Sequence, residues 1–300
     1  MAIVPVSPEF HAIIDSDVVV QQLATGFQFT EGPVWNALDG TLTFSDIPGD
    51  ALYRWRPGNT AEVLRKPSAN SNGNTLDPEG RLVTCEHSGR RVTRTNRDGT
   101  VETIADSFEG KRLNSPNDVI CAANGDIIFT DPPYGLRQPD GSFLPGELGF
   151  NGVFRSSAHN GRLTLLVGDF MRPNGLALSG DESRLYVADT QEGHIRVFDV
   201  RNDGSLANGR VFCETHHDGV TARPDGIKLD QRGNLYIASS TSSGVWVYDS
   251  AGNLAGQIGV GENPANLAFG GEGWRTLFVT AQTSVYSVRL KVSGQPVGAR

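Results

Sequence analysis

Short stretches in which apolar and polar residues alternate recur along the whole chain of 300 residues. Alternation with a period of two is typical of β-strands with one buried face, and no convincing helical pattern separates the stretches. The stretches align as six copies of one longer unit, and each first strand begins 40 to 57 residues after the previous one. These first strands are expected at residues 31–36, 72–77, 117–122, 174–179, 225–230 and 265–270.

Each unit continues in the same way after its first strand. A turn such as Asp39-Gly40 or Asn124-Gly125 leads to a second strand, a third strand follows, and five units add a weaker fourth. Four antiparallel strands at this spacing are the signature of a propeller blade. We therefore expect an all-β fold, a six-bladed β-propeller that forms a single domain over residues 1–300.

The sixth unit lacks a fourth strand, because its third strand ends near Leu290. The β-rich stretch 17–26 lies ahead of the first blade and is expected to pair with the sixth. The N-terminal segment 1–26 would then contain the strand that closes the ring and removes an open sheet edge. Loss of this segment should unfold the whole protein.

The longest spacing between units comes from residues 131–152, which lie between the second and third strands of blade three. This stretch is rich in Pro and Gly and contains Tyr134, Phe143 and Phe150. A long ordered loop is often a lid over a binding site. Asp131 and Tyr134 open the loop and are expected to contact substrate, although a rigid turn explains the sequence DPPYG equally well.

The residues that begin the six first strands should meet at one end of the central channel, since these strands line it. Five of the six carry a side-chain oxygen, and the column reads Glu31, Asn72, Asn117, Asn174, Asp225 and Ala265. For any single Asn-Gly or Asp-Gly pair, a turn is the simpler explanation. The hairpin turns of the blades lie elsewhere, however, so five oxygen-bearing residues at one place favour a ring of ligands.

The ring predicts a site for one divalent cation. Glu31 and Asp225 bring carboxylates and Asn117 and Asn174 bring amide oxygens, a donor set that suits a hard cation. We expect Ca²⁺ first, with Zn²⁺, Mn²⁺ or Mg²⁺ as alternatives, and the sequence has no His/Cys cluster of the kind zinc usually takes. Such a cation could polarise a carbonyl or phosphoryl oxygen and acidify a bound water.

Composition and charge limit the classes of molecule to which the protein is expected to bind. The net charge of −8 argues against nucleic acid, and no Lys/Arg-rich run or long apolar stretch points to a membrane. The three cysteines, Cys85, Cys121 and Cys213, are far apart and are interpreted as reduced core or strand residues. With no signal peptide apparent, we expect a cytoplasmic protein. Monomer and dimer both remain open.

Several phrases together resemble the gluconolactonase / regucalcin / luciferin-regenerating-enzyme family. They are FTEGPVW, NSPNDV, FTDPPYG, RPNGLALS, LYVADT and RPDGIKLD, and the likeness covers about residues 25–290. Residues 71–87 are similar to the bacterial gluconolactonase branch in particular. The resemblance implies a six-bladed propeller that hydrolyses lactones and binds a divalent metal through Glu31, Asn174 and Asp225. It also implies that Asn117 contacts metal or substrate and that the Asp ligand acts as a base.

One position departs from the animal members of that family, in which an Arg two residues before the Asn of blade three binds sugar hydroxyls. Here that position is Ser115, and Arg112 and Arg172 are the candidate replacements by proximity in sequence. His87 follows the second strand of blade two and could bind substrate or transfer a proton, since His titrates near neutral pH. A bond to a neighbouring blade is the alternative. His216 and His217 are expected in an exposed loop, because adjacent side chains diverge.

Three functions are compatible with these residues. The first is a metal-dependent hydrolase of sugar lactones, in which Asp225 or the metal activates water. Asn117 or Asn72 would then help to stabilise the oxyanion. The second is a phosphotriesterase of the diisopropylfluorophosphatase kind at the same site. The third is a calcium-binding or regulatory propeller without turnover, against which the five oxygen-bearing residues at one channel end argue.

Overall fold

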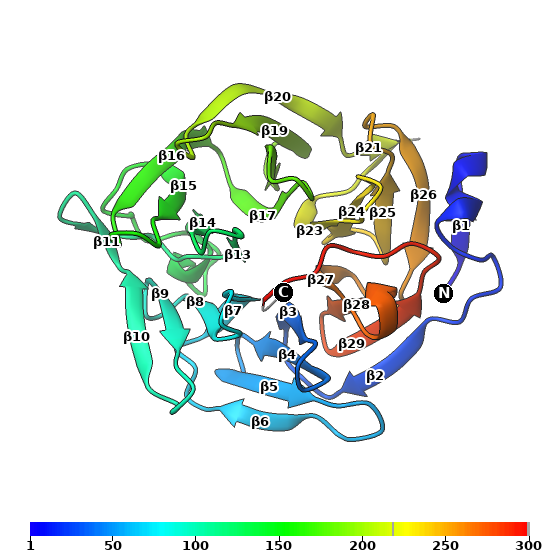
Figure 1. The fold of residues 1–300 in the computed structure, drawn as a ribbon, viewed down its shortest axis with the longest axis horizontal. Coiled ribbons are helices and arrows are strands. Elements are labelled where there is room, and N and C mark those ends of the chain that lie inside the picture. The colour runs from blue at the N-terminus through cyan, green and yellow to red at the C-terminus, as the bar shows by residue number, and fades with distance from the viewer. Residues whose placement is uncertain (218, 299–300) are drawn as a thin grey trace.

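The computed structural model describes residues 1–217 and 219–298, and it places six β-sheets around one central axis (Figure 1). The predicted six-bladed β-propeller of four-stranded antiparallel blades is confirmed. The inner strands begin within two residues of the predicted starts. Blade one consists of β3 (Thr30–Asn36), β4 (Thr41–Asp46), β5 (Ala51–Trp55) and β6 (Glu62–Arg65). Blade two consists of β7 (Ser71–Leu76), β8 (Leu82–Glu86), β9 (Arg91–Thr95) and β10 (Val101–Ala105). Blade three consists of β13 (Val119–Cys121), β14 (Ile127–Asp131), β15 (Asn151–Ser156) and β16 (Leu163–Phe170).

The other three blades follow the same order from the axis outward. Blade four consists of β17 (Pro173–Leu178), β18 (Arg184–Asp189), β19 (His194–Val200) and β20 (Leu206–Glu214). Blade five consists of β23 (Pro224–Leu229), β24 (Leu235–Ser239), β25 (Gly244–Tyr248) and β26 (Leu254–Gly259). Blade six consists of β27 (Pro264–Gly270), β28 (Thr276–Ala281), β29 (Ser284–Arg289) and β2 (Gln21–Thr25).

The N-terminal segment closes the ring as expected. Strand β2 pairs antiparallel with β29, so that Gln21 lies opposite Ser287 and Thr25 opposite Ser284. The same segment also adds an element that the pattern did not predict. Strand β1 (Ile3–Pro5) forms a fifth, outermost strand on blade five by pairing with β26, and the short helix η1 (Pro8–Ala12) buries Phe10 between blades five and six.

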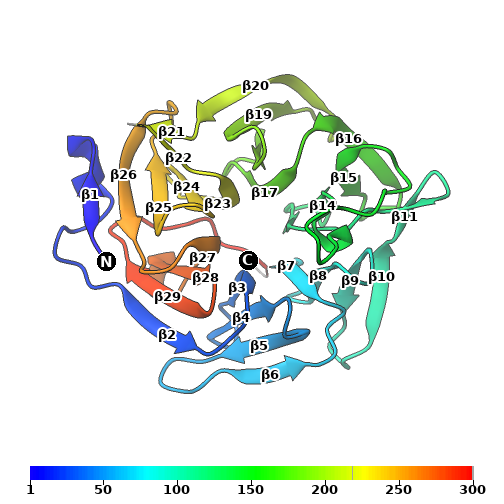
Figure 2. The same cartoon turned by 180° about the vertical axis from the view of Figure 1, so that it is seen from behind.

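The C-terminal segment up to Gly298 crosses the centre of the ring in both views (Figures 1 and 2). Gly294 forms an isolated β-bridge with Asp230, and the Gln295 amide donates to the Asp230 carbonyl. Pro296 and Val297 line a cavity of about 90 Å³ together with side chains of all six inner strands. The tail therefore covers the end of the channel at which the inner strands finish, opposite the end at which they begin.

Apolar side chains fill most of the spaces between blades. In the described ranges, five apolar clusters occupy the interfaces two–three, three–four, four–five, five–six and six–one. The interface between blades one and two instead holds a polar network built around the buried Glu86. The fold thus makes one blade interface different in chemistry from the other five.

Smaller features lie on the rim. Two short hairpins pair β11 (Ser107–Phe108) with β12 (Lys111–Arg112) and β21 (His216–His217) with β22 (Val220–Thr221), so the loop expected at the paired histidines is partly strand. The helices η2 (Tyr134–Leu136) and η3 (Glu272–Trp274) are single turns. The cysteines are free, as predicted: two are buried and one is half-buried.

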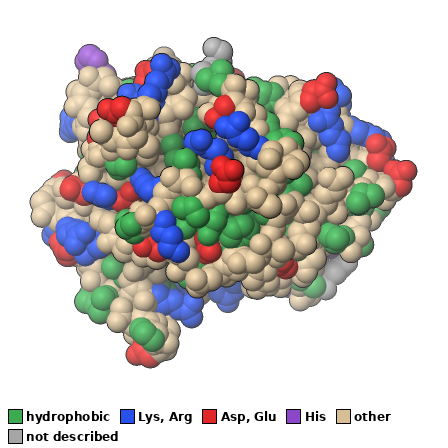
Figure 3. Space-filling model, turned by 90° about the horizontal axis from the view of Figure 1, so that it is seen from below, with side chains coloured by type: hydrophobic (Ala, Val, Ile, Leu, Met, Phe, Trp, Pro, Cys, Tyr) green, Lys and Arg blue, Asp and Glu red, His purple; other side chains and the backbone are tan. Residues whose placement is uncertain are grey.

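None of the helices in residues 1–217 and 219–298 is long and apolar enough to cross a membrane. On the side of the molecule seen in Figure 3, acidic and basic side chains are interspersed.

Candidate active site

The residues of the predicted ring lie where the inner strands begin, and a local irregularity turns them toward the axis. In five inner strands the pairing with the second strand shifts register at this point, for example between Glu31 and Val34 and between Ser71 and Asn74. A β-bulge of this kind re-aims side chains and is common beside active sites. Glu31, Asn72, Asn117 and Asn174 are each at most 5% exposed, and Asp225 is half-buried.

The glycine that follows most ring residues is required by the neighbouring blade. A Cβ on Gly32 would lie 2.1 Å from the Asn72 carbonyl oxygen, and one on Gly175 would lie 2.3 Å from the Asp225 carbonyl oxygen. These distances leave no room for any side chain. Glycine therefore follows the polar ring residue because neighbouring inner strands pack closely there, and not only because the chain turns.

Two blades carry a side chain where the others have this glycine, and both side chains enter the channel. Blade six has Asn266, whose Nδ2 donates to Glu31 Oε2 at 3.0 Å. Blade three has Asp118, which is 2% exposed, and its Oδ1 would lie 2.7 Å from a Cβ placed on Gly73. Asp118 adds a third carboxylate to Glu31 and Asp225, and it was not predicted from the sequence.

The three carboxylates influence one another. Burial, followed by the negative charge of Asp118, raises the pKa of Glu31 to about 7. Burial, followed by the charge of Glu31, raises the pKa of Asp225 well above its ordinary value. The balancing cation in this part of the chain is Lys228, whose Nζ lies 3.7 Å from Asp118 Oδ2. Three carboxylates and one ammonium leave a formal charge of −2 when all are ionised.

Several oxygens of the site are buried without a hydrogen-bond partner among the described residues. They include Asn72 Oδ1, Asp118 Oδ2 and Asn174 Oδ1, of which Asp118 Oδ2 has only the distant ammonium of Lys228 nearby. Buried polar atoms normally have a hydrogen-bond partner, so each of these calls for a ligand. In the described ranges no three His, Cys, Asp or Glu side chains could hold a metal together. Two carboxylates with amide oxygens and a charge of −2 nevertheless fit a hard divalent cation.

His87 is part of this site through Asn72. Its Nε2 lies 3.0 Å from Asn72 Nδ2, and because an amide nitrogen can only donate, Nε2 is the acceptor. Burial lowers the pKa of His87 to about 4, so the ring is neutral near pH 7. This contact holds the Asn72 amide with its oxygen free. Asn72 therefore presents an acceptor to the channel, which suits a substrate hydroxyl or a cation better than an oxyanion.

Asn174 is fixed in a similar way from blades four and five. Its Nδ2 donates to Thr190 Oγ1 at 3.0 Å, and Thr190 in turn donates to the Pro224 carbonyl at 2.7 Å. Tyr134, from the blade-three loop, lies against the same group. Burial raises the pKa of Tyr134 to about 12, and the charges of Asp225 and Arg172 act on its hydroxyl in opposite directions. The Tyr134 hydroxyl oxygen is buried and has no well-formed hydrogen bond in the described structure.

Asp131 belongs to a repeated support that sequence reasoning missed. Its two carboxylate oxygens accept the backbone N–H groups of Asn114 and Ser115 at 2.7 and 2.8 Å. These contacts favour a positioning role over the predicted contact with substrate. An Asp at the end of the second strand does the same in two other blades, and the signal was visible in the endings TFSD, IFTD and YVAD. The pairs are Asp46 with Gln28 and Phe29, and Asp189 with Met171 and Arg172.

The two candidate arginines lie in different settings. Arg112 is exposed, and its guanidinium donates to the Gly89 carbonyl on the rim. Arg172 is half-buried, directly precedes the Pro-Asn that begins β17, and stacks on Phe143 of the long loop with 5.0 Å between guanidinium and ring centroid. The structure thus brings Arg172, and not Arg112, to the mouth of the channel.

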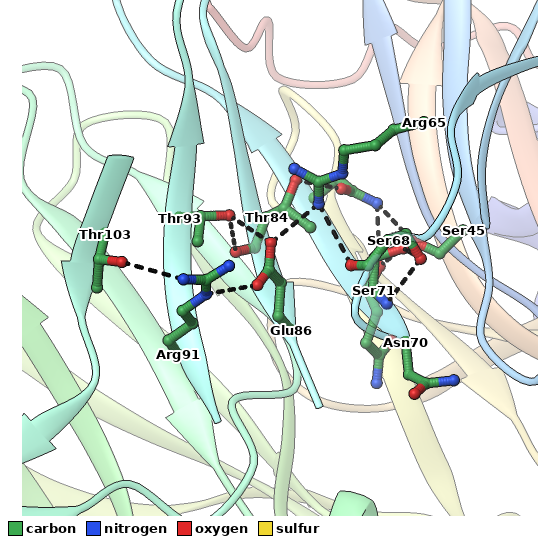
Figure 4. A network of polar contacts seen from close by, with 12 residues as sticks. Ser45, Arg65, Ser68, Asn70, Ser71, Thr84, Glu86, Arg91, Thr93 and Thr103 are labelled. Atoms are coloured by element: carbon green, nitrogen blue, oxygen red, sulfur yellow. Dashed lines mark hydrogen bonds and ion pairs between the residues drawn. The ribbon is translucent and has the colours of Figure 1, made fainter. Parts of the chain in front are cut away.

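A polar network behind the ring supports Asn72. Ser45 Oγ donates to the Asn72 carbonyl at 2.6 Å, and Asn74 Nδ2 binds both Ser45 Oγ and the same carbonyl. Figure 4 shows a network that includes Ser45 and Glu86, the last residue of β8, which accepts from Arg65 and Arg91. The position of Asn72 is therefore determined by contacts on both sides.

The family model described as "SMP-30/Gluconolactonase/LRE-like region" matches residues 29–283, which span every blade. The chain belongs to this family. A gluconolactonase of Zymomonas mobilis subsp. mobilis is 35% identical to this member, covering 96% of the chain and 86% of the relative.

Solved structures agree with this membership. A gluconolactonase of Xanthomonas campestris superposes on this SMP-30/gluconolactonase-type protein with a TM-score of 0.88 and 34% identity, covering 97% of this chain and 95% of the other. A regucalcin of Agrobacterium tumefaciens, described as a calcium-binding protein, has a TM-score of 0.79 at 17% identity, covering 94% and 97% of the two chains, and supports the fold.

Proposed function

We propose that this protein is a lactonase that opens sugar lactones such as glucono-1,5-lactone with the help of one bound divalent cation. The observation that carries the proposal is the ring itself: buried carboxylates and unpartnered amide oxygens converge at one channel end. Membership of the family and the similarity to two gluconolactonases support lactone hydrolysis as the reaction. The closed opposite end leaves the mouth beside Tyr134 as the entry.

Glu31, Asn117, Asn174 and Asp225 are the residues proposed to hold the cation, with Ca²⁺ as first choice. The regucalcin neighbour is described as calcium-binding, which is consistent with that choice. When bound, a divalent cation supplies a Lewis acid that polarises an ester carbonyl. Its charge also matches the −2 left by the three carboxylates and Lys228.

The side chains of this chain would act on water and substrate as follows. Asp225 accepts a proton from the attacking water, as a carboxylate of the ring at the channel mouth. The oxygen of this water adds to the lactone carbonyl carbon, and the ring C–O bond then breaks. The leaving alkoxide takes up a proton, which gives a hydroxy acid. The Asn117 side chain makes no hydrogen bond among the described residues and can donate to the developing oxyanion.

Three further assignments complete the proposal. The 131–152 loop acts as a lid over the mouth, because Tyr134 and Phe143 reach residues of blade four. Asn72 binds a substrate hydroxyl and His87 holds Asn72 in place. The protein works in the cytoplasm as a monomer or dimer.

The test uses one purified preparation. Hydrolysis of glucono-1,5-lactone is measured by acid release before and after removal of metal with EDTA, and again after addition of Ca²⁺, Mn²⁺, Mg²⁺ or Zn²⁺. We expect activity to disappear with EDTA and to return with Ca²⁺. Full activity in metal-free protein would refute the metal-dependent mechanism. A phosphotriester assayed in parallel decides the alternative reaction, which is supported only if phosphotriester turnover exceeds that of the lactone.

A further inference from the structure

Arg172 has an unusual environment for an arginine beside a buried site. Its backbone is fixed, because its N–H donates to Asp189 and its carbonyl accepts from Thr190. Its guanidinium stacks on Phe143, yet in the described part of the chain it donates no hydrogen bond and forms no ion pair. A guanidinium has five N–H donors in a planar fork, so this one offers a full set of donors at the channel mouth.

Tyr134 adds a second donor at the same place, close to Thr190 and Asn174. Its hydroxyl is buried without a partner of normal geometry and lies close enough to Arg172 and Asp225 for both charges to affect it. Tyr134 and Phe143 both come from the blade-three loop, which an isolated bridge between Arg137 and Phe143 keeps ordered. The loop therefore holds the tyrosine hydroxyl and, through Phe143, the guanidinium.

An acceptor of the ring decides which ligand group fits. Asn72 Oδ1, which is not one of the proposed cation ligands, is buried and has no hydrogen-bond partner among the described residues. A carboxylate or phosphate on the substrate could only accept, and it would leave the Asn72 oxygen unsatisfied. A hydroxyl both donates and accepts, so it can bind Arg172 or Tyr134 on one side and an amide oxygen on the other.

We propose that Arg172 and Tyr134 bind the hydroxyl groups of a polyhydroxylated lactone, and that Arg172 makes the site selective for sugar lactones over unsubstituted lactones. This inference rests on the lactonase function proposed above. Arg172 is then a specificity-determining residue that contacts the part of the substrate away from the scissile ester. It takes no part in the chemical step.

The experiment compares two neutral lactones, glucono-1,5-lactone and δ-valerolactone, which share the ester ring and differ in their hydroxyls. Arg172→Met should raise KM for glucono-1,5-lactone by about 10- to 100-fold, the range expected when charged hydrogen bonds are lost. The kcat for this lactone should stay within about threefold of wild type, because uniform binding is what is removed. Arg172→Lys should lie in between, since it keeps the charge and loses the fork.

Arg196→Met is the matched control. Arg196 lies in the same blade and stacks on Phe170 and Phe198 at 4.6 and 4.9 Å, but it is paired with Asp169 on the rim. Its substitution should leave both KM values unchanged. Thermal melting of each variant checks that the propeller is intact.

The outcomes separate cleanly. The proposal is supported if Arg172→Met raises KM for glucono-1,5-lactone and not for δ-valerolactone. If the wild-type protein hydrolyses only glucono-1,5-lactone, the same rise in KM for that lactone supports the proposal. An unchanged KM in Arg172→Met, or an equal loss on both lactones, overturns it. A wild-type protein that hydrolyses neither lactone overturns the proposed function instead, and this inference with it.

Discussion

Glu86 and Glu31 are both glutamates at most 3% exposed, and they lie in adjacent blades. Glu86 accepts from Arg65 at 3.0 Å, from Arg91 at 2.6 Å and from Thr93 at 3.0 Å, so both of its oxygens have partners and two of these are cations. Among the described residues, Glu31 accepts hydrogen bonds only from the Gly32 N–H and the Asn266 amide. Its charged neighbours include further acids, and its pKa is raised to about 7.

The difference indicates what each cluster is for. A buried carboxylate is tolerated in a stable protein when it is paired and hydrogen-bonded, and Glu86 meets that condition within the chain. The ring carboxylates do not, although Lys228 offsets part of their charge. The Glu86 cluster completes the polar interface between blades one and two, whereas the ring calls for a partner that comes from outside.

Removing a ring carboxylate should have the largest effect, and on activity alone. Asp225→Asn is expected to lower kcat/KM for glucono-1,5-lactone by about 10²- to 10⁴-fold, the usual contribution of a general base. The metal-free variant should melt at the same temperature as wild type or higher, because an uncompensated buried charge is lost. Kinetics and calorimetry on one preparation check both. A variant that unfolds as readily as a Glu86 variant would remove the distinction between the two clusters.

Breaking the Glu86 cluster should give the opposite pattern. Glu86→Gln is expected to destabilise the fold by about 2–4 kcal/mol, since two arginines lose their carboxylate at a buried interface. The matched control is Glu102→Gln, because Glu102 is an exposed partner of Arg94 and such pairs contribute about 0–1 kcal/mol. Urea denaturation measures both variants. Equal stability of the two would show that the network in Figure 4 contributes little.

Part of this comparison could be predicted from the sequence. The period of the strands, the closing strand and the column of ring residues follow from local patterns. The blades were therefore predicted correctly, and Glu31, Asn174 and Asp225 lie near the starts of inner strands, as expected. Strand β1 was not predicted, because three residues carry no periodic signal and their pairing with β26 is decided by packing.

Other parts of the site depend on which blades become neighbours. Asp118 occupies the place of a glycine, and its role appears only when the strand beside it approaches within van der Waals distance. Tyr134 belongs to blade three but acts on Asn174 of blade four, a contact across a loop that no spacing encodes. The Asp support at the ends of the second strands was readable, yet it had no meaning until the backbone it binds was known.

A cation that binds the ring should stabilise the protein through the ring and not through the Glu86 cluster. Calcium at 100 times its Kd is expected to add about 2.7 kcal/mol to the free energy of unfolding. This increment should vanish in Glu31→Gln and Asp225→Asn and persist in Glu86→Gln. Thermal unfolding with EDTA and with calcium measures it without any substrate. An increment that survives in both ring variants would place the bound cation elsewhere.

Lys228→Met should have the smallest effect and the most specific one. Lys228 is the ammonium beside the ring, 3.7 Å from Asp118 Oδ2, and its charge acts on Glu31. Without it the metal-free protein should lose about 1–2 kcal/mol, because Asp118 keeps a buried oxygen without a partner. Calcium should bind about tenfold more tightly, a gain of about 1.4 kcal/mol, because the dication then meets three carboxylates with no competing positive charge. Calorimetric titration of Ca²⁺ into both proteins decides the matter. Weaker binding to the variant would show that Lys228 orients Asp118 for the ion instead of opposing it.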